Sequence, residues 1–365
     1  MKKVLSIVLV LFSVIVGLDA QNVKDVKFAW TDASELTMLG QFFPDNANPY
    51  HRVDTLRFKG FTASENKQVR FGAGMACAFR TNSTIISVDP EYGDVSFPNN
   101  TMGISARGFD LYIRRGNQWV YASNAVSGDK SLNNPLMLIN NMDGEEKECL
   151  IYLPLQSELR ELKIGVQEGK TLQPLQNAFR HRIAFFGSSF THGTSTSRCG
   201  MNYPSQLSRA TGLQVLNLGC AGNCKLQPYF CDVLCATDAD AFVFDSFSNP
   251  TIAQIEERLF PFIEKLQKAH PGKPLIFQRT IYRERRNFNV AYEEFESQRQ
   301  DRAGELMRQA MKKYPDVYYI ETTNATAPTH ETSVDGVHPG DYGYTLWAES
   351  LQKPLLKILK KYGIK

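Results

Sequence analysis

The pattern of hydrophobic and polar positions changes character near residue 180. Before that point, short stretches alternate polar and apolar residues, which is typical of strands with one buried face. The clearest pair, residues 110–114 and 118–121, flanks Arg115-Gly116-Asn117 and predicts a β-hairpin. Further strand-like runs cover residues 71–88, 148–155 and 162–166. Several short strands without a long helical pattern predict a β-sandwich or jelly roll over residues 25–175.

Beyond residue 180, short apolar runs alternate with helical periodicity. The apolar runs predict five strands, at residues 182–186, 213–218, 241–244, 274–277 and 317–320. Helices are predicted over residues 252–269, 295–314 and 342–362, the last kinked or interrupted at Pro354. One face of the first helix carries Ile255, Leu259, Phe262, Ile263 and Leu266. Strands that alternate with helices form βαβ units, so residues 180–362 are predicted to be an α/β domain on a parallel sheet.

The first twenty residues belong to neither pattern. Lys2-Lys3 precedes an almost unbroken apolar run from Val4 to Val16, and a small residue follows at Ala20. This order is typical of a secretory signal peptide, residues 1–20, cleaved near Ala20. A membrane anchor is the alternative, but the apolar run is short for a span, so no membrane insertion is expected. The mature protein is therefore predicted to be exported, either to the periplasm or as a secreted protein.

Composition sets limits on the function. The chain has 365 residues, a length that favours two domains, and its net charge of +3 gives no support for nucleic-acid binding. Seven cysteines are an odd number, so at least one is unpaired. Four of them lie between Cys220 and Cys235, but their spacing is unlike that of zinc knuckles and no histidine lies among them. Small buried residues, with one disulfide as an open alternative, are favoured over a metal site.

Four short segments carry the candidate chemistry. The first, residues 187–193, places Ser189 in a glycine-flanked turn after a strand, with Ser188, Thr191 and Ser195 as competing hydroxyls. Ligands of doubly wound sheets bind beyond the carboxyl ends of the strands, so a nucleophile is well placed there. A serine in such a turn is, when taken alone, more often a capping or turn residue.

The second and third segments each follow a predicted strand and supply hydrogen-bond donors. Gly222, in residues 217–223, offers a backbone N–H to a developing oxyanion. Asn249, in residues 245–249, offers its side-chain amide for the same purpose. Taken alone, the second segment is better explained as a tight strand-to-helix turn, and Asn249 can be explained as a loop asparagine before Pro250. Only the combination with the other segments favours the functional interpretation.

The fourth segment, residues 335–339, places Asp335 three residues before His338, in a loop that leads into the last helix. A general base needs an acceptor that holds its second nitrogen, and Asp335 can supply that acceptor within one turn. The plain alternative is a loop aspartate beside an exposed histidine. No histidine pair has the spacing of a metal hydrolase, so neither a metal nor another cofactor is predicted.

Three further residues are candidates for substrate binding. His192 follows Ser189 by three residues, so it can line the site without being the base. Arg198 lies shortly after the first segment and is a candidate for the same wall. Arg279 opens the basic segment 279–286, which follows a strand at the same sheet edge and could hold an acidic sugar or a carboxylate. A solvated basic loop is the favoured interpretation of that segment.

In this order, the four segments resemble those of the SGNH hydrolase superfamily, also called GDSL-type esterases, over residues 180–362. The resemblance implies a flavodoxin-like, three-layer α/β/α fold. The first segment of that family usually reads Gly-Asp-Ser, whereas this chain has Gly187-Ser188-Ser189. A carboxylate beside the nucleophile is therefore absent. The whole chain is also similar to exported SGNH proteins of Bacteroidetes that carry a β-sandwich ahead of the hydrolase domain and are regarded as esterases of acylated glycans.

The resemblance also implies a role for each segment. Ser189 is the nucleophile, and His338 is the base oriented by Asp335. Gly222 and Asn249 join the backbone N–H of Ser189 as donors of an oxyanion hole. No cofactor takes part.

These expectations combine into a serine esterase that removes a short acyl group, with acetyl expected, from an acylated glycan or another small ester. The alternative from another class is a non-catalytic glycan-binding protein whose hydrolase domain has lost its activity. A peptidase or thioesterase is a second enzymatic alternative, because the chain order Ser, Asp, His does not separate esters from amides. The sequence predicts no particular oligomeric state.

Overall fold

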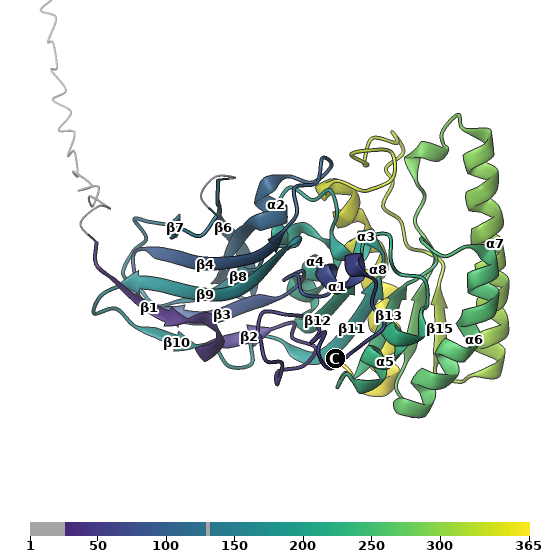
Figure 1. Cartoon of the computed structure of the whole chain (residues 1–365), viewed down its shortest axis with the longest axis horizontal. Coiled ribbons are helices and arrows are strands. Elements are labelled where there is room, and N and C mark those ends of the chain that lie inside the picture. Colours follow the sequence, from purple (N-terminus) through teal and green to yellow (C-terminus); the bar gives the residue numbers. More distant parts are fainter. Residues whose placement is uncertain (1–25, 129–131) are drawn as a thin grey trace, which may run out of the picture.

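The structure is a computed structural model and describes residues 26–128 and 132–365. Figure 1 shows two regions side by side along the long axis: antiparallel strands on one side, and a sheet with helices on both faces on the other. The predicted signal peptide lies outside the described residues. In the part of the chain that is described, no helix is both long enough and apolar enough to cross a bilayer.

Two antiparallel sheets form the N-terminal part, here called the sandwich region. The first sheet has the order β1 (Phe28–Asp32), β9 (Ser157–Gln167), β4 (Ile86–Val95), β7 (Leu136–Ile139). The second has the order β10 (Leu172–Pro174), β3 (Ala76–Thr81), β8 (Lys147–Tyr152), β5 (Gly108–Arg115), β6 (Gln118–Val126), with β2 (Thr37–Leu39) paired to β3. Side chains of both sheets, such as Val88, Ile164, Phe79 and Phe109, share one buried core. The predicted sandwich is therefore confirmed.

The predicted hairpin is also present. Strands β5 and β6 pair with Arg115 opposite Gln118, so Gly116-Asn117 forms the two-residue connection. Two short helices that the sequence pattern did not predict, α1 (Ala63–Gln68) and α2 (Gly103–Arg107), lie in the connections between strands. Helices of 6 and 5 residues are too short to leave a hydrophobic period in the sequence.

Five parallel strands form the sheet of the second part, here called the α/β region. Their order is β12 (Leu213–Gly219), β11 (Arg180–Gly187), β13 (Ala241–Asp245), β14 (Leu275–Gln278) and β15 (Val317–Ile320). All five coincide with predicted strands. Counted along the chain, this is the flavodoxin-like order 2-1-3-4-5. The winding reverses at β11, so the loops after β11, β12 and β13 surround a crevice at the carboxyl edge.

Helices cover both faces of this sheet, which confirms the predicted three-layer arrangement (Figure 1). One face carries α5 (Pro228–Ala236), α6 (Ile252–Ala269) and α7 (Val290–Lys313), and the other carries α4 (Tyr203–Thr211) and α8 (Asp341–Leu359). Helix α6 has the predicted bounds, and the five apolar residues of its predicted face are buried. Helix α7 begins at Val290, earlier than predicted, because Asn289 caps it by accepting from the N–H of Tyr292.

Helix α8 is not interrupted at Pro354, which lies inside it. A proline in a helix interior removes one backbone hydrogen bond and costs about 3 kcal/mol. Leu351, Leu355 and Leu359, on both sides of the proline, are buried against the sheet. Burying a leucine side chain contributes about 1.5–3 kcal/mol. Packing therefore outweighs the local preference of the proline and keeps the helix continuous.

The two regions share buried contacts. Four residues of the N-terminal chain pack into the cluster that α5, α6 and α7 form on the sheet: Phe42, Phe43, Val53 and Val69. Arg52 is fully buried between the regions, where its Nη1 donates to the carbonyl oxygens of Asn217 at 2.8 Å and Gly219 at 3.0 Å. A buried arginine of the N-terminal chain thus binds the carboxyl end of β12 directly.

The cysteines serve as small core residues in this arrangement. All seven are free thiols, and six of them are buried. Cys220, Cys224 and Cys231 belong to the buried cluster beneath α5, α6 and α7. The sulfur atoms of Cys231 and Cys235, one turn apart on α5, are 3.9 Å from each other.

Candidate active site

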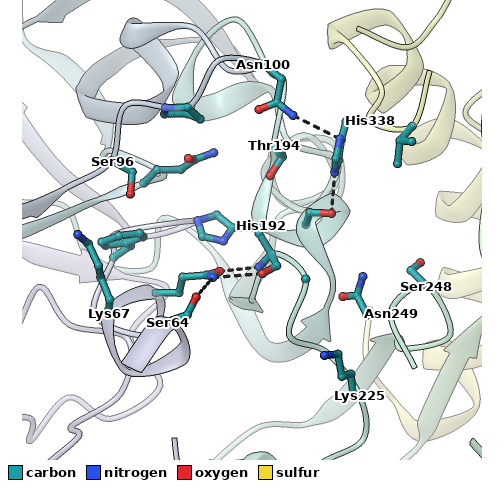
Figure 2. A pocket seen from close by; sticks show the side chains of 18 of the residues that line it. Ser64, Lys67, Ser96, Asn100, His192, Thr194, Lys225, Ser248, Asn249 and His338 are labelled. Carbon is teal, nitrogen blue, oxygen red and sulfur yellow. Dashed lines mark hydrogen bonds between the residues drawn. The ribbon is translucent and has the colours of Figure 1, made fainter. Parts of the chain in front are cut away.

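A pocket of about 700 Å³ opens at the carboxyl edge of the parallel sheet, between the two regions (Figure 2). All four sequence segments reach it, because Ser189, Gly222, Asn249 and His338 are among its lining residues. The opposite wall belongs to the N-terminal chain and consists of Ser64, Lys67, Gln68, Phe71, Ser96, Pro98, Asn100 and Gln156. The pocket is therefore shared by both regions.

Ser189 is the first residue of α3 (Ser189–His192), a single helical turn that follows β11. Ser188 caps this turn by accepting from the N–H of Phe190 at 3.2 Å. Ser189 is 8 % exposed, and its Oγ lies 2.9 Å from Nε2 of His338. A strand end followed by one capped turn thus presents a single hydroxyl to the base.

Gly219 allows α3 to lie close to β12. A Cβ atom at this position would be 2.1 Å from the backbone nitrogen of His192 and 2.5 Å from its Cα. Only glycine permits this approach, so a larger residue would displace α3 and with it Ser189. Asn217 adds a specific bond, because its Nδ2 donates to the carbonyl oxygen of Thr191 at 2.7 Å. The second segment therefore also positions the first.

His338 and Asp335 lie in the loop that precedes α8. Nδ1 of His338 is 2.8 Å from Oδ2 of Asp335. The other carboxylate oxygen, Oδ1, accepts from the backbone N–H groups of Val337 at 3.0 Å and His338 at 2.8 Å. One aspartate thus organises its own turn and holds the imidazole ring. The tautomer that fits these contacts carries its proton on Nδ1 and offers Nε2 to the hydroxyl of Ser189.

The Asp335 carboxylate is stabilised in its ionised form. Burial alone raises the pKa of Asp335, but hydrogen bonds from the backbone of His338, the side chain of Asn100 and the ring of His338 lower this pKa well below its usual value. Asn100 makes its bond from the sandwich region, with Nδ2 at 2.9 Å from Oδ2. Sequence reasoning missed this contact, because Asn100 lies 235 residues away and its neighbours Asn99 and Thr101 form no catalytic pattern.

The predicted oxyanion donors line the same pocket as Ser189. Gly222 adopts a left-handed backbone with φ of +72°, which favours glycine, in the turn after β12. Asn249 accepts at Oδ1 from the N–H of Cys224 at 3.3 Å, which leaves its amide N–H groups free to donate elsewhere. As the first residue of a helix, Ser189 also has a backbone N–H with no partner inside that helix. Donors after β11, β12 and β13 therefore line one pocket.

The carboxylate that is missing from the first segment comes from the neighbouring strand. Ser188 stands where the resemblance suggested an aspartate, and its hydroxyl donates at 2.7 Å to Oδ2 of Asp245, the last residue of β13. The hydroxyls of Thr191 and Ser248 also donate to this carboxylate, each at 3.1 Å. Burial raises the pKa of Asp245. Sequence reasoning named Asp245 only as part of the third segment and missed its role as the anchor of the first.

His192 lines the pocket but is almost completely buried, with 1 % of its surface exposed. Its Nε2 lies 2.6 Å from the carbonyl oxygen of Leu155, so Nε2 carries the proton. Within the described part of the chain, Nδ1 has no hydrogen-bond partner. Burial, reinforced by the charge of Arg52, lowers the pKa of His192 to about 3. The ring is therefore neutral near pH 7, and its bond to Leu155 joins the two regions.

Arg198 is not among the described residues that line this pocket. Its Nη1 lies 3.0 Å from Oδ2 of Asp110 and 2.8 Å from the hydroxyl of Tyr112, and its guanidinium stacks on the ring of Tyr121 at 3.9 Å. All three partners belong to the β5–β6 hairpin. Asp110 is fully buried, and burial raises its pKa, so Arg198 supplies the compensating charge. Arg198 ties the α/β region to the sandwich region.

Arg279 is likewise absent from the described lining of the pocket. Its side chain is exposed, and its Nε lies 3.3 Å from Oε1 of Gln300 on α7. Its backbone N–H donates to the carbonyl oxygen of Ile320 at 2.9 Å, which extends the pairing of β14 with β15. Arg279 therefore lies over α7 instead of facing the candidate nucleophile.

The basic segment 279–286 reaches the pocket through Arg283 instead. Arg283 is 8 % exposed and forms an ion pair with Glu296 on α7, with 2.8 Å between Nη1 and Oε1. Its Nη2 donates to the carbonyl oxygen of Ser248 at 2.8 Å. The buried carboxylate compensates its charge, so Arg283 supports the third segment from behind.

The assembled groups are those that acyl transfer needs: a hydroxyl bonded to a base, an acid that orients the base, and N–H donors beside them. Within residues 26–128 and 132–365, no group of three or more His, Cys, Asp or Glu side chains is arranged to hold a metal ion. Together, Ser189, His338, Asp335 and the N–H donors have the arrangement that nucleophilic catalysis by a serine requires.

Two family profiles match the chain. The profile of the GDSL-like lipase/acylhydrolase family matches residues 180–356, and that of the N-terminus of SGNH-hydrolase-type esterases, called GxDLY, matches residues 28–172. The sequence Gly108-Phe109-Asp110-Leu111-Tyr112 fits the pattern in the second name. Its aspartate and tyrosine are the residues that bind Arg198. The hairpin prediction covered this motif without recognising it.

Solved structures match both regions together. A GDSL-like lipase candidate from Bacteroides ovatus is 34% identical, with a TM-score of 0.88, over 92% of this chain and 98% of that chain. A salicylyl-acyltransferase from a tetracycline biosynthetic pathway is 16% identical, with a TM-score of 0.69, over 93% and 99%. A family two carbohydrate esterase from Cellvibrio japonicus is 12% identical, with a TM-score of 0.58, over 92% and 98%. The last two are similar in fold. No curated protein sequence matches the chain.

Proposed function

Because the chain belongs to the GDSL-like lipase/acylhydrolase family, we propose that it is a serine esterase with Ser189 as nucleophile, His338 as general base and Asp335 as the acid that orients the base. The observation that carries this proposal is the continuous hydrogen-bonded chain from Ser189 Oγ through the imidazole to the carboxylate, at 2.9 and 2.8 Å. Ser189 and His338 line a pocket that is also lined by Gly222 and Asn249, the two expected oxyanion donors.

In the first step, Nε2 of His338 takes the hydroxyl proton of Ser189 while Oγ attacks the carbonyl carbon of the ester. The carbonyl oxygen becomes negative and is stabilised by the N–H groups of Ser189 and Gly222 and by the amide of Asn249. Asp335 stabilises the imidazolium. His338 then gives its proton to the leaving alcohol, the ester C–O bond breaks, and the acyl group remains on Ser189.

In the second step, a water molecule replaces the alcohol. His338 takes a proton from this water, and the oxygen of the water attacks the acyl carbon. The same donors stabilise the second oxyanion. His338 returns the proton to Oγ of Ser189 as the acyl–serine bond breaks, which releases the carboxylic acid and restores the enzyme.

The proposed substrate is a short acyl ester, with acetyl as the first choice, on a carbohydrate. Much of the pocket wall consists of hydroxyl, amide and cationic groups, including Ser64, Lys67, Gln68 and Lys225. Such a wall suits sugar hydroxyls better than a long acyl chain. The likeness in fold to a family two carbohydrate esterase is consistent with this choice. We also propose that residues 1–20 direct export, which would give the enzyme access to extracellular glycans.

The proposal is tested by the hydrolysis of p-nitrophenyl acetate. Ser189→Ala is expected to lower kcat by at least about 10³-fold. Ser195→Ala is the matched control, because Ser195 is a nearby hydroxyl whose Oγ, within the described residues, is buried without a hydrogen-bond partner. The control is expected to keep the wild-type rate. Equal rates for wild type and Ser189→Ala would show that another group performs the chemistry.

A substrate series separates the proposal from its alternatives. An acetyl ester, a long-chain ester and a peptide p-nitroanilide distinguish an esterase of short acyl groups from a lipase and a peptidase. Release of acetate from an acetylated xylan tests the carbohydrate part. A protein that binds glycans but cleaves none of these compounds would support the non-catalytic alternative.

A further inference from the structure

Asn100 contacts the candidate catalytic residues from the opposite wall of the pocket. It lies in residues 96–102 of the sandwich region, which join β4 to α2. Its Nδ2 is 2.9 Å from Oδ2 of Asp335. Figure 2 shows its amide directed at the ring of His338, with 3.5 Å between Nδ2 and Nδ1. When the proton of His338 is on Nδ1, both nitrogens are donors. The amide of Asn100 therefore donates to the carboxylate and only packs against the imidazole.

The contact completes the set of donors around Asp335. Oδ1 is held by two backbone N–H groups of its own turn, whereas Oδ2 is held by His338 and Asn100. The carboxylate side chain is 28 % exposed, and the terminal torsion of an aspartate is soft. Without Asn100, the ring of His338 would be the only group among the described residues that holds Oδ2. Asn100 therefore opposes rotation of the carboxylate toward solvent.

The amide of Asn100 is itself held in one orientation. The hydroxyl of Thr101 donates to Oδ1 of Asn100 at 3.4 Å, and it accepts from the N–H of Ser195 at 3.0 Å and from the amide of Gln156 at 3.3 Å. The one donor and both acceptor positions of this hydroxyl are thus used. Ser195 follows α3 in the α/β region. The network therefore fixes Asn100 relative to both regions, with Nδ2 directed at Asp335.

We propose that Asn100 is a positioning residue of the reaction, through which the sandwich region holds Asp335 in the orientation that serves His338. The inference rests on the proposed function, because it assigns a role within the same three-residue chain. It makes the sandwich region part of the catalytic unit. A neutral amide suits this role, because it donates a hydrogen bond and leaves the negative charge that the imidazolium needs.

Other charged groups near the loop of Asp335 and His338 are not altered by a substitution at residue 100. Those that face this loop are Arg283, Glu284 and Arg285 from the loop before α7, and Asp341 from α8. Arg285 donates from Nη2 to the backbone carbonyl of Asp335 at 3.2 Å. A shift in the pKa of His338 after a substitution at residue 100 therefore reports on that residue.

The first test compares Asn100→Ala with Asn99→Ala. Asn99 is the matched control, because it is the adjacent residue of the same type and is exposed. Asn100→Ala is expected to lower kcat for p-nitrophenyl acetate by about 10- to 10²-fold, with KM little changed, because a misoriented base slows the chemical step. Asn99→Ala is expected to keep the wild-type kcat. Thermal unfolding of both variants shows whether either change acts through folding.

The second test uses Asn100→Asp, which keeps the shape and replaces the donor by a carboxylate. A second negative charge beside the ring stabilises the imidazolium, so the pKa of His338 is expected to rise by about one unit or more. NMR titration measures this shift directly, since the chain has 6 histidines and His338→Gln assigns the signal. The acid limb of the profile of kcat/KM against pH should move to higher pH by the same amount.

The outcomes separate this inference from the proposed function. If Ser189→Ala abolishes hydrolysis, but Asn100→Ala keeps kcat and Asn100→Asp leaves the pKa of His338 in place, the esterase stands and the role of Asn100 is overturned. If Ser189→Ala keeps full activity, the proposed function fails, and the role of Asn100 fails with it even where the titration shows contact. Loss of kcat in Asn100→Ala together with the shift in Asn100→Asp supports both.

Discussion

The two walls of the pocket are built in different ways. The α/β wall presents Ser189, Gly222, Asn249 and His338 from loops that follow parallel strands or precede α8. The carboxyl ends of parallel strands meet at one edge, so these loops converge by topology alone. The sandwich wall presents side chains from α1 and from loops between antiparallel strands. The proposed reacting groups therefore lie on the α/β wall, which the sheet topology assembles, and the proposed supporting groups lie on the sandwich wall, which packs against it.

The joints between the walls are buried and polar. The contacts that connect the regions include Arg52 with the carbonyl oxygens of Asn217 and Gly219, Arg198 with Asp110, and His192 with the carbonyl oxygen of Leu155. Each of these contacts includes a residue in or close to a candidate catalytic segment. Changes on the α/β wall should therefore alter chemistry, whereas changes at the joints should alter stability and positioning.

The largest effect is expected from removing the base on the α/β wall. His338→Gln deletes the group that takes the proton of Ser189, so kcat for p-nitrophenyl acetate should fall by about 10⁴-fold or more. The urea midpoint should change little, because the ring lies at the surface of the pocket. Substantial residual activity would mean that His338 on the α/β wall is not the general base.

The ion pair between Arg198 and Asp110 tests whether the contacts between the regions contribute mainly to stability. Arg198→Met leaves a fully buried carboxylate without its cation, so the free energy of unfolding should fall by about 3–5 kcal/mol. Urea denaturation measures this loss, and kcat at low temperature should be less affected. Combining Arg198→Met with Asp110→Asn removes the buried charge and should recover part of the stability. A loss below about 1 kcal/mol would place this pair among surface ion pairs.

An intermediate effect is expected from the oxyanion donor Asn249. Asn249→Ala removes one donor to the developing charge, so kcat should fall by about 10²-fold while KM changes little. Asn249→Asp has nearly the same shape but repels the oxyanion, and it should be slower than the alanine variant. Steady-state kinetics at pH 8 measure kcat and KM of both variants. An aspartate variant faster than the alanine variant would exclude an oxyanion contact.

The smallest effect is expected from the pH dependence of the His192 joint. The pKa of His192 is lowered to about 3, whereas an unfolded histidine titrates near 6.5. Between these values the unfolded chain binds the proton more tightly, so stability falls as pH drops from about 6.5 toward 3. The loss between pH 6.5 and 5 is up to about 2 kcal/mol. His192→Gln keeps an amide donor to Leu155 and should flatten this slope in urea denaturation.

Much of the fold could be predicted because buried faces leave periods in the sequence. Helix α6 shows such a period, whereas the five parallel strands are predicted by short apolar runs, because helices cover both faces of their sheet. Elements of a single turn, such as α3 (Ser189–His192), are too short to show a period. At Pro354, the local rule predicted a kink or an interruption, and the helix continues through this residue because the leucines on both sides of it are buried.

The sequence by itself determined which candidate residues meet on the α/β wall. Ser189, Gly222 and Asn249 follow predicted strands that share one sheet edge, and Asp335 holds His338 within a single turn. Only the tertiary structure decided that Asn100 faces Asp335, that Asp245 anchors Ser188, and that Arg198 faces the sandwich instead of the pocket. These contacts join elements that are far apart in the sequence, so neither a hydrophobic period nor a local turn indicates them. Their geometry depends on how separate elements dock, which neighbouring residues in the chain do not encode.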